Sequence, residues 1–141
     1  MKKVVFTLLT LVLVSCSSSI KQTENKSLFE VLTQQSDGGA SIRFFEILSE
    51  PDEIAMLEND EKLKDKIHPN DIQTSNFIVL NMGEKMTGGY EINVESVVET
   101  EKNIIVTIKE VAPAPDTKVS QEITTPYSIV KIKSKKEIII K

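Results

Sequence analysis

Apolar and polar residues follow two different periods along the chain, and these periods predict one helix and several strands. After the turn signal at Asp37-Gly38-Gly39, the run from Ile42 to Leu48 is rich in apolar and aromatic residues and predicts a strand. From Pro51 to Lys66 the apolar residues recur at helical spacing, with Ser49 as a candidate cap and His68-Pro69 as an end signal. The first half of the chain therefore predicts a strand followed by one amphipathic helix.

Beyond residue 76 the period becomes two, which is typical of strands. Phe77 to Leu80 is a short continuous apolar run, as expected for a strand that is buried on both faces. Alternating residues in Tyr90 to Val94 and in Ile104 to Ile108 predict a hairpin, and a slip in the alternation after the first of these segments predicts either a bulge or a strand end. A second hairpin is predicted from two further segments, Ser128 to Ile132 and Ile138 to Ile140.

These elements together predict a mainly β (α+β) fold. We expect a small antiparallel sheet folded as a sandwich or partly open barrel, with one amphipathic helix packed on it. The single globular domain is placed at residues 37–141, and residues 16–36 are interpreted as a polar tether. Within the tether, Leu28 to Leu32 fits either a short helix or a first strand, and the pattern does not decide between them.

The first fifteen residues have the layout of a secretory signal peptide. Lys2 and Lys3 precede an apolar run that ends at Val14, which is shorter than the roughly 20 residues that span a bilayer. Leu13 to Cys16 resembles a lipobox, in which the cysteine receives a lipid before cleavage. We therefore predict that residues 1–15 are removed and that lipid on Cys16 anchors the protein to a membrane of the cell envelope. The alternative is a plain signal peptide with a chance cysteine.

Composition narrows the chemistry that the chain offers. Cys16 is its only cysteine, so lipidation leaves no thiol for a disulfide, a nucleophile or a metal site. The formal net charge of −4 makes nucleic acid a poor partner. His68, the only histidine, stands at the predicted helix end without a marked nucleophile, and the carboxylates lack metal-loop spacing. We predict no catalytic residues, no metal and no cofactor apart from the covalent lipid, and hence a protein that is not an enzyme.

Three motifs in the second half of the chain occur in an order typical of one family. They are a glycine and lysine segment from Asn81 to Ile92, a proline loop from Val111 to Pro115, and a Pro-Tyr strand from Thr124 to Ile132. Over residues 76–132 the chain resembles the C-terminal domain of the PrcB protease-complex family, with Met86 where a proline is expected. The resemblance implies a non-catalytic lipoprotein that binds or stabilises an exported protease.

The segment Thr87-Gly88-Gly89-Tyr90 is the leading candidate for a partner-binding surface. Paired glycines permit positive φ and close approach of another backbone, and a tyrosine at a loop edge combines apolar area with a hydroxyl. The alternative is that the glycines satisfy a tight connection and Tyr90 fills the core. Pro113 and Pro115 favour an extended loop, which is either a second contact for a protease or a stiff crossover.

Two further functions stay open at this point. The Thr87 to Tyr90 segment also resembles the Thr-Thr-Gly-Tyr loop of chagasin-type cysteine-protease inhibitors, which implies direct inhibition as an alternative. The other alternative is a structural envelope lipoprotein with no link to a protease.

Overall fold

The computed structural model describes residues 28–141, so the predicted signal peptide, Cys16 and the tether up to residue 27 lie outside the described part. The strands of this part form two sheets. The four-stranded sheet is antiparallel in the order β1 (Phe29–Gln35), β6 (Tyr127–Ile132), β3 (Asn76–Asn81) and β2 (Phe44–Leu48). The three-stranded sheet has the order β4 (Glu91–Glu99), β5 (Asn103–Val111) and β7 (Glu137–Ile140). Two short helices, α1 (Pro51–Leu57) and α2 (Asp71–Thr74), follow β2.

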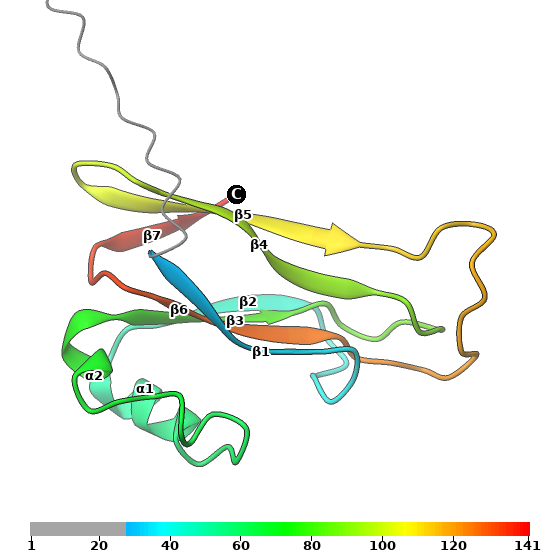
Figure 1. Ribbon diagram of the computed structural model, residues 1–141, viewed down its shortest axis with the longest axis horizontal. Coiled ribbons are helices and arrows are strands. Elements are labelled where there is room, and N and C mark those ends of the chain that lie inside the picture. Colours follow the sequence, from blue (N-terminus) through cyan, green and yellow to red (C-terminus); the bar gives the residue numbers. More distant parts are fainter. Residues whose placement is uncertain (1–27) are drawn as a thin grey trace, which may run out of the picture.

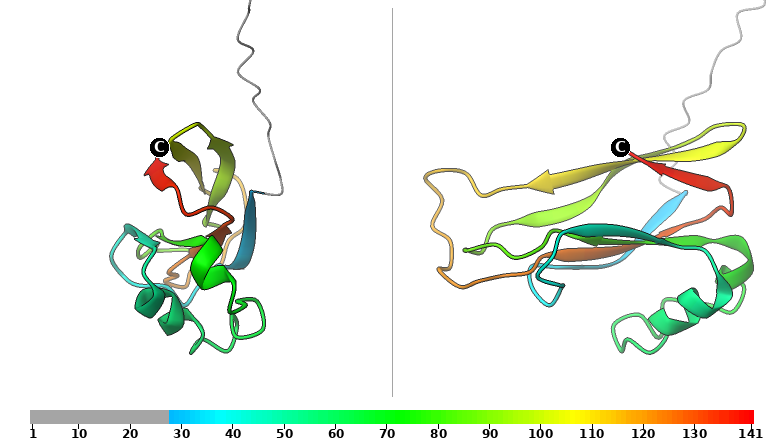
Figure 2. Two further views of the ribbon diagram at one scale, coloured as in Figure 1. Left: turned by 90° about the vertical axis from the view of Figure 1, so that its left-hand side faces the viewer. Right: turned by 180° about the vertical axis from the view of Figure 1, so that it is seen from behind.

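The two sheets pack face to face, and the helices cover the other face of the four-stranded sheet (Figures 1 and 2). The core between the sheets joins two sets of buried side chains, one from β3 and β6 and one from β4, β5 and β7. A second apolar cluster lies under the helical segment, where Phe77 and Ile129 of the sheet meet Ile54, Leu63 and Ile67. The prediction of a mainly β sandwich with helix packed on it is confirmed, and the sheets do not close into a barrel.

Local strand predictions in the second half of the chain are confirmed. β3 is a central strand between β6 and β2, and five of its six residues are buried, as the continuous apolar run indicates. β4 and β5 form the predicted hairpin, whose turn is closed by a hydrogen bond of 2.8 Å from the Thr100 amide to the Asn103 carbonyl. The pairing shifts register between Val94 and Ser96, so the slip in the alternation is a bulge and not a strand end.

The prediction of a second hairpin from residues 128–140 is wrong. β6 and β7 belong to different sheets, and β7 pairs in parallel with β5, from Asn103 and Glu137 to Val106 and Ile140. The connection between β6 and β7 is held by Asn76, whose side-chain amide donates to the carbonyl of Lys136 at 3.1 Å. Ile138 is buried in the core between the sheets, and an apolar segment that faces a core shared by two sheets does not specify its partner strand.

The predicted helix from Pro51 to Lys66 is too long, because α1 ends at Leu57 and gives way to turns. Its cap is Glu50, not Ser49, and Glu50 forms a capping box with Glu53. Beyond α1, Asp60 Oδ1 accepts a hydrogen bond of 2.8 Å from the amide of Lys62, a local contact that competes with helical bonds. Leu63 and Ile67 are nevertheless buried, so the apolar stripe identified the buried residues correctly.

The folded domain begins before the predicted boundary at residue 37, because β1 is an edge strand of the four-stranded sheet. The undecided segment from Leu28 to Leu32 is therefore mostly strand. Its register shifts between Val31 and Thr33, and the neighbours Leu32 and Thr33 are both buried. Two consecutive buried residues break the period of two that identifies a strand in a sequence.

Candidate partner-binding site at one end of the sandwich

Three connections meet at one end of the sandwich, which we call the loop end (Figure 1, right-hand side). They are residues 36–43 between β1 and β2, residues 82–90 between β3 and β4, and residues 112–126 between β5 and β6. All of the candidate partner-binding residues from the sequence, Thr87 to Tyr90, Pro113 and Pro115, lie on two of these connections. The structure thus gathers them at one end of the molecule.

Asn81, the last residue of β3, fixes the first connection. Its buried side chain donates to the carbonyl of Ala40 at 2.8 Å and accepts from the Ala40 amide at 2.9 Å. The same side chain also donates to the carbonyl of Ile42, which keeps Ile42 and Arg43 in the loop and explains why β2 begins at Phe44 instead of Ile42. Sequence reasoning missed this role, because a polar residue at the end of an apolar strand reads as a simple strand end.

The segment 84–88 lies between the other two connections and joins them. Glu84 donates its amide to the carbonyl of Ser41 at 3.0 Å, and Lys85 pairs with Thr124 as an isolated antiparallel bridge. The hydroxyl of Thr124 donates to the carbonyl of Thr87 at 2.8 Å, and the amide of Gly88 donates to Ser120 at 3.0 Å. The loop end is therefore one hydrogen-bonded layer and not three independent loops.

The two glycines of the candidate segment are required by the approach of the third connection. Gly89 has φ +87°, and a Cβ at this position would lie 2.9 Å from both Pro113 Cβ and Val119 Cγ1. A Cβ on Gly88 would lie 2.6 Å from Ser120 Oγ. The structure brings Pro113 against the glycines, whereas Pro115 is exposed beside a turn that the Thr117 amide closes. This geometry gives Gly88 and Gly89 a packing role, which agrees with the alternative that the glycines satisfy a tight connection.

Tyr90 is only half-exposed, because its ring packs against the core between the sheets. The ammonium group of Lys85 lies 5.5 Å from the centre of this ring, a cation–π contact that covers part of it. The exposed apolar side chains of the loop end are instead Ile42, Met86 and Ile123. Met86 and Ile123 lie beside the Lys85–Thr124 bridge, and Met86 is the more exposed of these two, at 70%. The sequence marked Met86 only as a departure from the family pattern.

Asp37 joins the first connection to the third through its carboxylate. Its Oδ1 accepts hydrogen bonds of 2.9 Å from both the hydroxyl and the amide of Thr125. These bonds stabilise the charged form, so the Thr125 hydroxyl, followed by the Thr125 and Gly38 amides, lowers the pKa of Asp37. The turn predicted at residues 37–39 therefore also ties β1 to the residues that precede β6.

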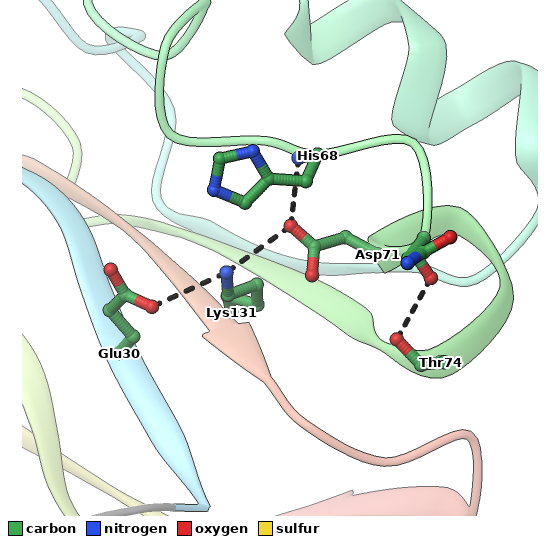
Figure 3. Close-up of polar contacts among 6 residues, drawn as sticks. Glu30, His68, Asp71, Thr74 and Lys131 are labelled. Atoms are coloured by element: carbon green, nitrogen blue, oxygen red, sulfur yellow. Dashed lines mark hydrogen bonds and ion pairs between the residues drawn. The ribbon is translucent and has the colours of Figure 1, made fainter.

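A second polar cluster lies near the other end of the four-stranded sheet (Figure 3). The ammonium group of Lys131 on β6 lies 3.2 Å from Asp71 Oδ2 and 3.3 Å from Glu30 Oε2. The backbone amide of His68 donates to the same Asp71 oxygen at 2.9 Å. His68 is exposed, and its imidazole forms no hydrogen bond or ion pair with residues 28–141, as expected for a surface residue at the end of a helical segment. The cluster attaches α2 to β1 and β6.

Residues 28–141 contain neither a cluster of metal-binding side chains nor a helix that could span a membrane. No group of three or more His, Cys, Asp and Glu side chains in this range is arranged to hold a metal ion. None of the helices in the same range has the length and apolar character needed to cross a membrane.

The fold and the loop end together define a β-sandwich domain with a built surface at one end. Residues 76–133 match the family model described as PrcB C-terminal, which confirms the resemblance predicted for residues 76–132. The match runs from β3 through β6 and so contains two of the three connections of the loop end, but it covers less than half of the 141 residues. Comparisons with curated proteins and with solved structures gave no match.

Proposed function

We propose that the protein is a non-catalytic binding subunit, anchored by lipid on Cys16, that holds or stabilises an exported protease at the cell envelope. The observation that carries this proposal is the PrcB C-terminal match over residues 76–133, which sets the protein in the context of a protease complex. The lipobox-like segment from Leu13 to Cys16 supports the anchor. The hydrogen-bonded loop end supports a binding role, because a preorganised surface loses little conformational entropy on binding.

Contact with the protease is made by the exposed apolar residues of the loop end. Met86 follows Lys85 and Ile123 precedes Thr124, so the antiparallel Lys85–Thr124 bridge brings the two residues to the same side of the bridge. Ile42 lies on the neighbouring connection. Methionine and other large apolar side chains are typical of the centre of protein interfaces, whereas the glycines behind them keep the surface in shape. In this proposal Thr87 to Tyr90 positions the surface more than it touches the partner.

In the proposed arrangement the anchor and this surface are connected to opposite ends of β1. In the β1–β6 pair, Gln35 faces Tyr127 beside the loop end, whereas Phe29 faces Ile132 at the other end of the strands. A chain that comes from a lipid on Cys16 enters β1 at Phe29, at the end of the strand opposite the loop end. Even fully extended, residues 16–29 span at most about 45 Å, so the partner is held close to the membrane.

The test is to isolate the lipidated protein from its native envelope after cross-linking and to identify the bound proteins by mass spectrometry. An exported protease is expected with the unchanged protein and with an Ile139→Glu control, which adds a charge on β7 away from the loop end. The double variant Met86→Glu and Ile123→Glu is expected to reduce recovery of the protease at least tenfold. Recovery of only peptidoglycan or other envelope components would support the structural alternative and overturn this proposal.

The activity of the protease in the recovered complex distinguishes stabilisation from inhibition. A stabilising subunit leaves the protease active and lengthens its lifetime, whereas a chagasin-like inhibitor abolishes cleavage of a small peptide substrate. Thr87 is tied by its carbonyl to Thr124, and Gly88 and Gly89 are packed against the third connection, which favours the stabilising role.

A further inference from the structure

The four free sheet edges of residues 28–141 are not equally protected against pairing with another chain. β1 and β4 each carry a register shift, which twists an edge and disrupts its hydrogen-bonding row. β7 has only four residues and follows a lysine-rich connection. β2 pairs with β3 over all five of its residues without a shift, and no described strand covers its outer edge.

The exposed side chains of β2 make its edge still more open to pairing. Phe44 and Ile47 are both exposed large apolar residues, whereas natural edge strands are usually blunted by charges, prolines or bulges. Glu46 is the only charged residue of the strand. A regular, apolar and uncovered edge of this kind is the template to which an extended peptide adds as a further strand.

A groove of about 350 Å³ lies between this strand and α1. Leu57 of α1 and Val79 of β3 contribute apolar side chains to its lining, and Met56 adds an accessible one. Three carboxylates, those of Glu46, Glu53 and Asp60, also line the groove. An apolar wall with carboxylates near it is complementary to a side chain that has an aliphatic stem and a cationic end, which describes lysine and arginine.

The carboxylates keep acceptor capacity for such a ligand. Glu53 Oε2 accepts the amides of Ser49 and Glu50 at 3.0 and 3.1 Å, which leaves its second oxygen for another donor. Asp60 likewise uses Oδ1 for the amide of Lys62. The carboxylate of Glu46 has no hydrogen bond or ion pair with any residue between 28 and 141.

We propose that the free edge of β2 binds an extended segment of a partner protein and that the groove receives a lysine or arginine side chain of that segment. Glu46 pairs with Val79, and both line the groove, so this face of β2 is directed toward α1. Alternate side chains of an added strand lie on the same face, which brings one of them beside Glu46. This inference holds whether or not the partner is a protease.

A second copy of the chain fits this edge less well than a basic partner. Glu46 is the central residue of β2, so a symmetric antiparallel pair of two β2 strands places the two Glu46 carboxylates opposite each other. Like charges that lie directly opposite in a sheet are destabilising. A lysine or arginine at the same place forms an ion pair instead.

The test titrates the ¹⁵N-labelled full-length mature protein in detergent micelles with a capped six-residue peptide of alternating threonine and lysine. Chemical-shift changes are expected at the amides of β2 and α1, and a peptide of alternating threonine and glutamate is expected to produce none. A third peptide, with proline in place of the central threonine, is expected to bind at least fivefold more weakly, because proline cannot donate a ladder hydrogen bond. Equal binding of the proline peptide would overturn strand addition.

Substitutions of Glu46 test whether its carboxylate binds the lysine side chain of the peptide. Glu46→Gln is expected to weaken binding of the lysine peptide about threefold, the value of one partly exposed ion pair, and Glu46→Lys at least tenfold. Glu101→Lys, a charge change in the β4–β5 turn, is the matched control and is expected to leave binding unchanged. Unchanged affinity in Glu46→Lys, or a dimer of the unliganded protein in light scattering, would overturn the proposal. No protease takes part, so this result is independent of the test of the proposed function.

Discussion

Removal of the Asp71 carboxylate should destabilise the protein through the charge that it leaves behind. The side chain of Lys131 is only 6% exposed, and its two partners are Asp71 and the 49%-exposed Glu30. In Asp71→Ala the lysine keeps the weaker, solvent-screened partner, and the His68 amide loses its acceptor. Removing one member of a buried ion pair costs about 3–5 kcal/mol. Because Glu30 remains as a partner, we expect a smaller loss of about 2–3 kcal/mol.

The measurement is the free energy of unfolding from urea titrations at pH 7, compared with two further variants. Glu30→Gln removes a half-exposed partner and should cost at most about 1 kcal/mol. The double variant Asp71→Asn and Lys131→Met removes both charges and should recover most of the loss, because a well-packed neutral pair replaces a buried ion pair at little cost. The reasoning fails if Asp71→Ala costs under 1 kcal/mol or if the double variant is no more stable than Asp71→Ala.

Two further predictions concern the loop end. Gly89→Ala adds a Cβ at φ +87° that lies 2.9 Å from Pro113 Cβ, and thermal unfolding should show a loss of about 2–3 kcal/mol. Gly38→Ala is the control, because Gly38 has φ +102° but the atom nearest to an added Cβ lies 3.5 Å away, and it should cost only about 1 kcal/mol. Equal losses of stability in Gly89→Ala and Gly38→Ala would show that contact with Pro113 does not add to the cost at Gly89. Asp37→Asn should lower the melting temperature at pH 7. Because hydrogen bonds from Thr125 lower the pKa of Asp37, its contribution is present above about pH 4 and is lost as the pH falls through the folded pKa. A difference between Asp37→Asn and the unchanged protein that persists at pH 2 would contradict this.

The strands that the sequence predicted correctly are those whose pattern is set by neighbours in the chain. The β4–β5 hairpin has a regular period and a local turn, and β3 is a continuous apolar run between Asn76 and Asn81, so each pattern lies within its own segment of the chain. β7 has an equally clear apolar pattern, but its partner is β5, and pairing across a sandwich is decided by the whole core. β1 stayed undecided between a short helix and a first strand because its bulge puts two buried residues in succession.

For the candidate site, the sequence identified the segments that come together but not the side chains that they expose. The motif order placed Thr87 to Tyr90 and Pro113 in one functional unit, and the structure brings them into contact through Gly89. Which side chains of that unit reach solvent depends on how three distant connections meet. The exposure of Met86 and the anchoring role of Asn81 arise only from that meeting, and no local pattern encodes them.

The register of β1 also determines how force from the proposed anchor would act on the domain. In the proposed arrangement, lipid on Cys16 would pull on Phe29, whereas a partner at the loop end would pull on the connection that leads into Tyr127 of β6. These two points lie at opposite ends of the antiparallel pair, so the force runs along the strands and is shared by all the paired residues at once. Pulling from the Gln35 end would instead open the pairs one after another, at a lower force. The Lys131–Glu30 contact, close to the Phe29 end, adds to this resistance, so in the proposed arrangement β1 would be loaded along its length and not opened from one end.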